Sequence, residues 1–256
     1  MTDDQPILSV RRVSKSFDGV RAVDDVSFDV APAAITGLIG PNGAGKSTVI
    51  NIIGGSLQSS GGSVLFAGHQ EMLGLPPYRR SRLGLVRTFQ RSSEFGGLTV
   101  LENLLVAGTD PKEVSLRAAL VRRRQWRRDE HQLLDHAAET LSGFGMLDKA
   151  NDRAANLSGG QKRLLELGRA LMLKPRLLLL DEPFAGVSPV IAHQIEIALK
   201  RLADDGLAVL LVEHQLDVIG RLCAQVVMMA QGQVLSTGTM EQLRKDPEVV
   251  DAYLAG

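Results

Sequence analysis

The nine residues 40–48 constrain this chain more than any other stretch. They read Gly-Pro-Asn-Gly-Ala-Gly-Lys-Ser-Thr and match the G-x-x-x-x-G-K-[ST] pattern of a phosphate-binding P-loop. The apolar run 35–39 before them predicts a buried strand, and the run 49–53 after them predicts the start of a helix. This order of strand, loop and helix is the context that the motif requires. The alternative is a glycine-rich turn that matches the pattern by chance.

Each residue type in the loop suits phosphate binding. Glycines let the backbone approach an anion without a Cβ in the way, and successive N–H groups at a helix N-terminus then point at it. Lys46 is expected to reach the β- and γ-phosphates, and the Ser47 hydroxyl to bind Mg²⁺. The predicted nucleotide-binding residues are Gly40, Pro41, Asn42, Gly43, Ala44, Gly45, Lys46, Ser47 and Thr48. The loop alone specifies neither the nucleotide nor the use of its energy.

Composition narrows the remaining choices. A chain of 256 residues is long enough for one large α/β domain or two small ones. Lys+Arg and Asp+Glu are equal at 29 each, so bulk charge gives no argument for binding nucleic acid. Cys223 is the only cysteine, which excludes an internal disulfide and favours a reduced, cytoplasmic protein. The start of the chain lacks the pattern of a signal peptide, and the apolar runs of the sequence are shorter than a membrane helix requires. If the protein works at a membrane, other subunits would therefore have to supply the spans.

Strands and helices alternate along the chain, which predicts an α/β sheet protein. Strands are predicted at 7–13, 26–30, 35–39, 63–66, from 85, and at 176–180, 207–212, 226–229 and 234–236. Helices are predicted from 49, at 99–106, 129–144, 162–174 and 189–203, and in a tail, 239–254, that Pro247 breaks. The helical section between Gln90 and Leu157 is interpreted as a lobe inserted into the sheet protein.

Polar residues stand at the ends of several predicted strands. Asp181 and Glu182 follow the apolar run 176–180, where ligands of α/β sheets bind, and two carboxylates there suit Mg²⁺ and water beside a triphosphate. His214 follows the run 207–212, and a structural and a functional role are equally open for it. Gln90, at the end of the strand that begins at 85, is by itself an ordinary surface residue.

Two other features have a plain and a functional interpretation. Residues 157–161, Leu-Ser-Gly-Gly-Gln, precede a helix whose N-terminus is either a second anion site or an ordinary capped end with Ser158 as the cap. Phe17 by itself is a core aromatic residue at a strand end.

Taken in order, the P-loop, Gln90, the Leu-Ser-Gly-Gly-Gln motif, the Leu-Leu-Leu-Leu-Asp-Glu run at 177–182 and His214 resemble the ATP-binding subunit of an ABC transporter. The resemblance implies one P-loop NTPase domain spanning 1–256, with a mainly parallel core sheet, an antiparallel β subdomain and an inserted α-helical lobe. Residues 1–90 and 157–256 would form the catalytic core with the β subdomain. Residues 91–156 would form the helical lobe that leads into the motif at 157–161.

The family likeness also implies roles for single residues around the nucleotide. Phe17 matches the aromatic residue that stacks on adenine, although the family more often has tyrosine there. Gln90 matches the glutamine near Mg²⁺ that faces the membrane subunits, and Asp181 matches the aspartate that holds Mg²⁺ mostly through water. Glu182 matches the carboxylate that polarises the attacking water, and His214 matches the histidine at the γ-phosphate.

The signature motif implies a dimer. Ser158, Gly159, Gly160 and Gln161 match the residues that close on the γ-phosphate held by the P-loop of the other subunit. Activity would therefore need two ATPase subunits, alike or different. One departure from the family pattern is Ser188, which stands where the family often has an aspartate.

Further stretches resemble one subfamily, the ATPase subunits of branched-chain amino acid importers. They are Val86–Gln90, Leu98–Ala107, the arginine-rich segment 117–128, Glu213-His-Gln and the tail Gly238–Leu254. The likeness implies ATP and Mg²⁺ as cofactors and a peripheral place on the cytoplasmic face of the cell membrane. It implies as partners two transmembrane permease subunits, a second ATPase subunit and an extracytoplasmic solute-binding protein, with no nucleic acid.

Close relatives of that subfamily leave alternatives open. Urea or amide importers and exporters of lipid or lipopolysaccharide share much of the pattern, but the exporters usually lack the arginine-rich segment, which favours import. That segment surrounds Trp126 and is either a solvated helical face or a contact to a membrane surface or partner. A soluble ABC ATPase or a P-loop GTPase fits less well, because the chain has one cassette and lacks an Asn-Lys-x-Asp motif.

Overall fold

The computed structural model describes residues 5–88, 94–109 and 123–254, with the side chains of 123–129 and 253–254 outside the description. The chain divides into two compact units. Unit 1 holds Met1–Gln90, Arg176–Ala185 and Leu199–Gly256, and unit 2 holds Arg91–Pro175 and Gly186–Ala198. The predicted roles of Gln90 and of Arg117 and Arg122 fall on residues outside the described ranges.

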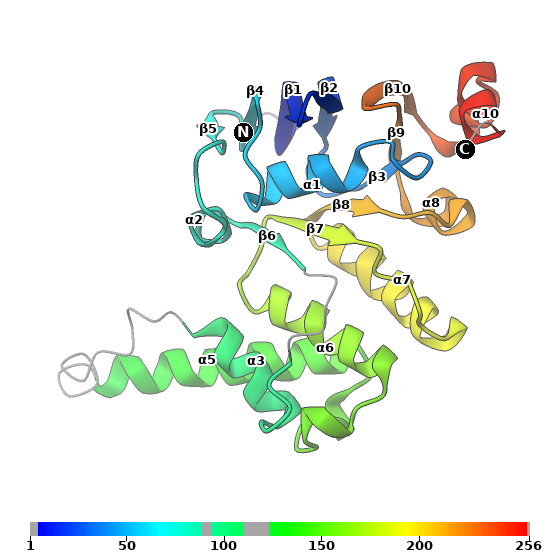
Figure 1. Ribbon diagram of the computed structural model, residues 1–256. Coiled ribbons are helices and arrows are strands. Elements are labelled where there is room, and N and C mark those ends of the chain that lie inside the picture. The colour runs from blue at the N-terminus through cyan, green and yellow to red at the C-terminus, as the bar shows by residue number, and fades with distance from the viewer. Residues whose placement is uncertain (1–4, 89–93, 110–122, 255–256) are drawn as a thin grey trace. The chain divides into compact units, whose positions relative to one another are not determined.

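Unit 1 contains two sheets, which Figure 1 shows on either side of helix α1. The first is antiparallel and has the strand order β2-β1-β4-β5. The second has the order β10-β9-β3-β8-β7-β6, in which β10 runs antiparallel to β9 and the other five strands run parallel to one another. Their strands are β1 (Leu8–Phe17), β2 (Val20–Val30), β3 (Ile35–Ile39), β4 (Gly61–Phe66), β5 (Gln70–Glu71), β6 (Leu85–Arg87), β7 (Leu177–Asp181), β8 (Ala208–Val212), β9 (Gln225–Ala230) and β10 (Gln233–Gly238).

Burial explains which strands lie in the middle of the parallel sheet. β3, β7 and β8 are buried at every residue, as uninterrupted apolar strands covered on both faces should be. Helix α1 (Lys46–Gly54) contacts β2 of the antiparallel sheet and β6 and β7 of the parallel sheet. Its four buried apolar residues, Val49, Ile50, Ile52 and Ile53, join one core cluster with residues of both sheets. The P-loop therefore leads directly into the centre of the core.

Four shorter helices complete unit 1. They are α2 (Pro77–Arg82), α8 (Leu216–Leu222), α9 (Met240–Leu243) and α10 (Pro247–Leu254). The tail is helical on both sides of a break before Pro247, as the sequence predicted. Helices α2 and α8 were not predicted, because six or seven residues are too few to establish a helical period.

Unit 2 is helical. It contains α3 (Val100–Gly108), α5 (Arg123–Gly143), α6 (Gly159–Leu171), 3₁₀ turns at Leu147–Lys149 and Ala154–Asn156, and the first part of α7 (Pro189–Asp204), whose last residues belong to unit 1. Helix α3 contacts both α5 and α6. Thr99 and Glu102 form the predicted capping box at the start of α3.

Some element boundaries differ from the predicted ones, with local reasons. Helix α1 begins at Lys46 rather than 49, because the last residues of the P-loop are already its first turn. Helix α6 begins at Gly159, since a capping box formed by Ser158 and Gln161 supports two glycines in its first turn. Strand β2 begins at Val20 rather than 26, because a shift of register beside Asp25, where φ is +54°, interrupts the alternation of apolar residues.

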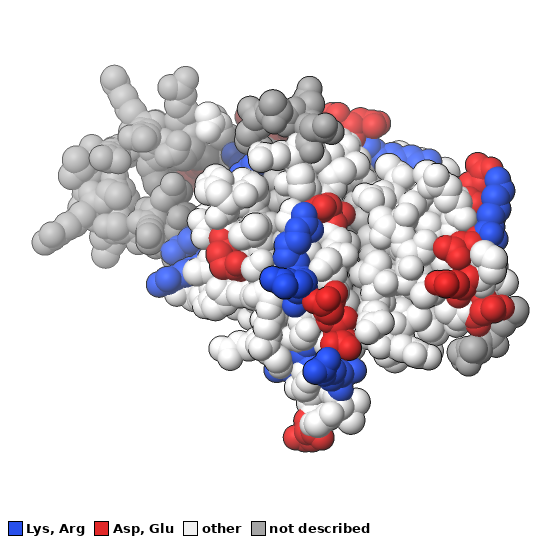
Figure 2. Space-filling view, turned by 90° about the horizontal axis from the view of Figure 1, so that it is seen from above, with Lys and Arg blue, Asp and Glu red and all other residues white. Residues whose placement is uncertain are grey.

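The charged surface agrees with the balanced composition. On the face drawn in Figure 2, acidic and basic side chains lie next to one another with wide uncharged areas between them. Several pairs are close enough to be ion pairs, including Arg11 with Asp29 at 2.6 Å and Lys245 with Glu241 at 2.7 Å. Among the residues described, no helix is long and apolar enough to cross a bilayer.

Candidate functional site

The sheet order brings three loops of unit 1 together. Strands β3, β8 and β7 are neighbours and run parallel, so their carboxyl ends lie at one edge of the sheet. The P-loop follows β3, His214 follows β8, and Asp181 ends β7. Ligands of open α/β sheets bind outside such ends. The topology thus places the predicted phosphate, metal and histidine residues at the same edge.

Two glycines of the P-loop are required by close backbone contacts. A Cβ on Gly40, where φ is +146°, would lie 2.0 Å from the Met229 carbonyl oxygen. A Cβ on Gly45, where φ is +96°, would lie 2.6 Å from the Ala22 carbonyl oxygen. Gly45 is also the N-cap of α1, which has no side-chain cap and no acidic residue in its first turn. The N–H groups at this helix start are therefore available to an anion.

Lys46 is buried, with 5% of the residue exposed. Its Nζ donates to the carbonyl oxygens of Gly40 at 2.7 Å and Pro41 at 2.9 Å. Burial lowers the pKa of Lys46, and the charges of Glu182 and Asp181 oppose that shift. Both carboxylates are therefore close enough for their negative charges to act on the Lys46 ammonium.

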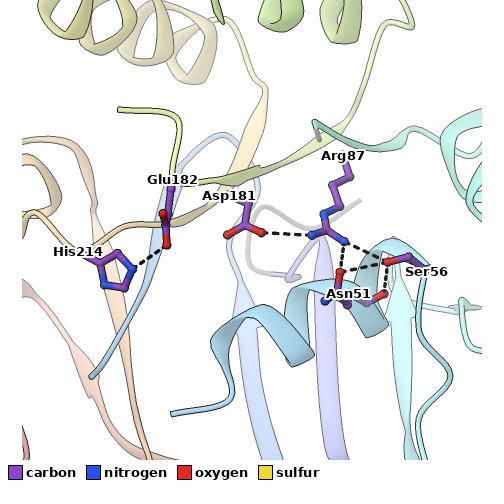
Figure 3. Close-up of polar contacts among 6 residues, drawn as sticks. All are labelled: Asn51, Ser56, Arg87, Asp181, Glu182 and His214. Atoms are coloured by element: carbon purple, nitrogen blue, oxygen red, sulfur yellow. Dashed lines mark hydrogen bonds and ion pairs between the residues drawn. The ribbon is translucent and has the colours of Figure 1, made fainter. Parts of the chain in front are cut away.

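Asp181 is 3% exposed and pairs with Arg87, the last residue of β6 (Figure 3). The Arg87 Nη2 lies 3.2 Å from Asp181 Oδ2, while Nη1 donates to Asn51 Oδ1 of α1 at 2.6 Å and to Ser56 Oγ at 3.1 Å. Sequence reasoning missed Arg87 and Asn51. An arginine three residues before Gln90 belongs to none of the general nucleotide-binding motifs. Its partners Asn51 and Asp181 are 36 and 94 positions away in the sequence.

Glu182 and His214 point toward each other in Figure 3, with 2.7 Å between Glu182 Oε1 and His214 Nε2. Both side chains are partly exposed, at 32% and 43%. Glu182 has φ +50°, which is uncommon for a residue with a side chain, and its backbone N–H donates to the Val212 carbonyl oxygen at 2.9 Å. The sharp turn after β7 aims this carboxylate at the residue that follows the next strand.

A second buried carboxylate, Glu213, supports this arrangement. It is 2% exposed, and its two oxygens accept the backbone N–H groups of Phe184 at 3.1 Å and His214 at 3.0 Å. It therefore ties the turn after β7 to the turn after β8 and fixes the backbone on both sides of the Glu182–His214 pair. Sequence reasoning assigned it no role, because only the folded chain shows its two backbone partners.

Phe17 lies at the end of β1 and is 44% exposed, which rules out the core position that a lone aromatic residue would suggest. The Lys15 ammonium lies 5.2 Å from the centre of its ring. An exposed ring on unit 1 is free to stack on a planar group.

The signature motif lies in unit 2. The Ser158 Oγ accepts the Gln161 N–H at 3.3 Å, and Gln161 Oε1 accepts the Ser158 N–H at 2.9 Å. Ser158 and Gly159 are exposed, while a Cβ on Gly160 would lie 2.8 Å from Ile191 Cγ1. The predicted cap is confirmed, and the motif presents an exposed helix start.

Ser188, the departure from the family pattern, lies near the start of α7. Its Oγ accepts the Ile191 N–H at 3.4 Å, and its carbonyl accepts the Ala192 N–H at 2.9 Å. The serine therefore helps to begin the helix that Pro189 opens.

The oxygen atoms at the sheet edge fit a magnesium ion better than a softer metal. Mg²⁺ prefers one or two carboxylates together with phosphate and water, and Asp181 and the Ser47 hydroxyl offer oxygen ligands of that kind. Within the described residues, three or more His, Cys, Asp or Glu side chains do not gather as a metal site held by protein alone would require.

Comparisons with known proteins agree with this geometry. The model of the ABC transporter family matches residues 23–185. Two relatives are each 38% identical over 251 residues and span 98% of both chains. They are the high-affinity branched-chain amino acid transport ATP-binding proteins LivG of Escherichia coli (strain K12) and BraF of Pseudomonas aeruginosa.

A solved structure agrees over the same length. The ADP conformation of MJ1267, an ATP-binding cassette of an ABC transporter, superposes with a TM-score of 0.84 and 34% identity, covering 98% of this chain and 100% of that one. The fold and the family that the motifs resembled are thereby confirmed. The chain belongs to the ABC transporter family and is an ATP-binding subunit with ATPase activity.

Proposed function

We propose that the chain couples ATP hydrolysis to the import of branched-chain or related amino acids. The likeness to LivG and BraF over 98% of both chains carries the choice of solute. The convergence of the P-loop, Asp181 and the Glu182–His214 pair at one sheet edge supports the use of ATP. We further propose that units 1 and 2 belong to one ATPase domain, with unit 2 contributing the helical lobe.

Nucleotide binding is assigned to the P-loop and to Phe17. The backbone N–H groups of the P-loop, other than Pro41, which has none, would cradle the phosphates, and Lys46 would exchange its two carbonyl acceptors for phosphate oxygens. Its buried ammonium has a high energetic cost without an anion, which the β- and γ-phosphates would lower. The exposed ring of Phe17 would stack on adenine.

Hydrolysis is assigned to the Glu182–His214 pair. In phosphoryl transfer the protein mainly positions the attacking water and offsets charge on the γ-phosphate oxygens. The Glu182 carboxylate would accept a hydrogen bond from that water, and an Nε2–H tautomer of His214 would orient the carboxylate across their 2.7 Å contact. Bound Mg²⁺, held by Ser47, Asp181 and Gln90, the last of which is assigned from the sequence alone, would offset phosphate charge.

The signature residues are assigned to the partner ATPase subunit's nucleotide. Ser158, Gly159, Gly160 and Gln161 begin an exposed, capped helix, and such a start favours an anion. A Ser158→Arg variant should bind ATP normally as an isolated subunit and lose hydrolysis in the assembled pair. Weakened ATP binding by the isolated subunit would contradict a role in trans.

The proposed partners are two transmembrane permease subunits, a second ATPase subunit, alike or different, and an extracytoplasmic solute-binding protein. The chain would then sit peripherally on the cytoplasmic face of the membrane. The described helices contain no membrane-crossing candidate, so in this proposal the permeases provide the passage.

The experiment is a pull-down of tagged protein from gently solubilised membranes of the native host. Two multi-span proteins and a second ATPase should co-elute, and leucine with the matching binding protein should stimulate ATP hydrolysis by that complex. Stimulation by urea or an amide instead, or co-elution of lipid-export components, would favour the alternative transporters. A soluble pool without membrane partners would contradict the transport function.

A further inference from the structure

Arg87 lies beside Asp181, the proposed magnesium ligand, and several polar contacts hold its side chain there. It ends β6, and its side chain is only 13% exposed. Its guanidinium reaches Asp181 on one side, and on the other side it reaches Asn51 within the P-loop helix α1 and Ser56 just after that helix (Figure 3). One side chain thus links the ends of two neighbouring strands to the helix that begins with Lys46.

Gly54 makes room for this arginine. A Cβ on Gly54, the last residue of α1, would lie 2.9 Å from Arg87 Cδ. Gly54 has an ordinary helical conformation, so alanine would suit its backbone and favour the helix. The absence of a side chain at this position is therefore explained by the arginine that crosses it.

Stability alone does not explain an arginine at position 87. Its Nε is buried and, within the described part of the chain, has no hydrogen-bond partner. Burying a guanidinium with an unsatisfied donor costs free energy that an apolar side chain in the same place would avoid. What the arginine adds is geometry, because its planar fork fixes a carboxylate and an amide at the same time.

We propose that Arg87 is the positioning residue for Asp181, and that it sets how strongly the chain binds magnesium with nucleotide. The guanidinium holds the carboxylate in one orientation relative to α1, and therefore relative to Ser47 in its first turn. This inference rests on the proposed role of Asp181 as a magnesium ligand. Groups that orient a metal ligand commonly change metal affinity 10–100-fold when they are removed.

The test measures how much magnesium tightens nucleotide binding. The dissociation constant of AMP-PNP, a non-hydrolysable ATP analogue, is measured by titration calorimetry in EDTA and in excess Mg²⁺. The constant in EDTA divided by the constant in Mg²⁺ is called the magnesium gain. Arg87→Met should lower this gain about tenfold while leaving the constant in EDTA within twofold. An unchanged gain, an increased gain, or an equal loss in EDTA would each overturn the proposal.

Two further variants separate positioning from charge and from folding. Arg87→Lys keeps the charge, but one ammonium cannot span both Asp181 and Asn51, so the gain should fall about threefold. Full retention of the gain would overturn the role of the fork, whether or not the methionine variant folds. Gly54→Ala should lower the gain in the same direction without lowering the urea midpoint, since only the arginine is displaced. An unchanged gain would contradict the role of Gly54.

Two controls identify which claim fails. Arg11→Met removes another Arg–Asp pair, with Asp29, on the antiparallel sheet, and should leave the gain unchanged. Asp181→Asn should abolish most of the gain. If it does not, the proposed role of Asp181 is wrong. If Asp181→Asn abolishes the gain and Arg87→Met does not, only the present inference is wrong.

Discussion

The far end of the P-loop helix depends on one buried arginine. Arg80 of α2 is 2% exposed, and it donates from Nη1 to the carbonyl oxygens of Ile52 and Ile53, each at 2.6 Å, and from Nε to that of Leu75 at 2.8 Å. Two of these acceptors belong to the last turn of α1, where carbonyls lack partners within the helix. The cationic side chain also suits the negative end of the helix dipole.

The cost of Arg80→Met follows from these contacts. A hydrogen bond from a charged donor contributes about 1.5–3 kcal/mol, so three such bonds set an upper range of about 4.5–9 kcal/mol. The Ile52 oxygen keeps a second donor, the Gly55 N–H at 3.1 Å. Burial also lowers the pKa of Arg80, because removing the guanidinium from water disfavours its charge, and this desolvation offsets part of the gain from the hydrogen bonds. We therefore expect a net loss of about 3–4 kcal/mol in the free energy of unfolding.

Urea unfolding followed by circular dichroism measures this loss, with Arg79→Met as the matched control. Arg79 is an exposed neighbour on the same helix, so its variant should stay within about 0.5 kcal/mol of the unmodified protein. A loss below about 1 kcal/mol for Arg80→Met, at an unchanged slope, would refute the reasoning. Such a small loss would mean that the cost of desolvating the Arg80 guanidinium cancels the stabilisation from its hydrogen bonds.

Three other outcomes are expected from single groups. Glu182→Gln should lower ATP hydrolysis about 10²–10⁴-fold and leave ATP binding intact; near-normal turnover would mean that Glu182 is misassigned. Desolvation raises the pKa of the half-buried Cys223 thiol to about 12, so a disulfide reagent at pH 8 should label it far more slowly in the native than in the denatured protein, and equally rapid labelling of the two would contradict the raised pKa. The hydrogen bond from Lys162 lowers the pKa of Glu94 in the folded protein. This pair therefore stabilises the fold fully above pH 4.5, the ordinary carboxyl pKa, and the stabilisation is lost as the pH falls below that value and Glu94 becomes protonated. The urea midpoints of the unmodified protein and Glu94→Gln should therefore differ at pH 7 and converge in acid; a constant difference would contradict the ion pair.

The sequence was informative wherever local chemistry determines structure. The P-loop, the apolar runs of β3, β7 and β8 and the caps at Thr99 and Ser158 each depend on residues close together in the chain. From these runs alone, the carboxyl ends of β7 and β8 could be expected to carry the polar residues Asp181 and His214.

What the sequence did not reveal depends on contacts between distant segments. The Asn51–Arg87 contact joins residues 36 positions apart, and the Arg87–Asp181 contact joins residues 94 positions apart. Glu213 was visible as a charge beside His214, but its link to Phe184 across 29 positions required the folded sheet. Such residues position the motif residues, and motif patterns do not include them.

Transport in the native host tests the central claim most directly. Uptake of radiolabelled leucine is compared in a strain that lacks this chain and in the same strain supplied with either the unmodified protein or Glu182→Gln at equal levels. Uptake should fall on deletion, return with the unmodified protein and stay low with the variant. Uptake that persists without the chain, or that Glu182→Gln restores in full, would contradict ATP-driven import by this protein.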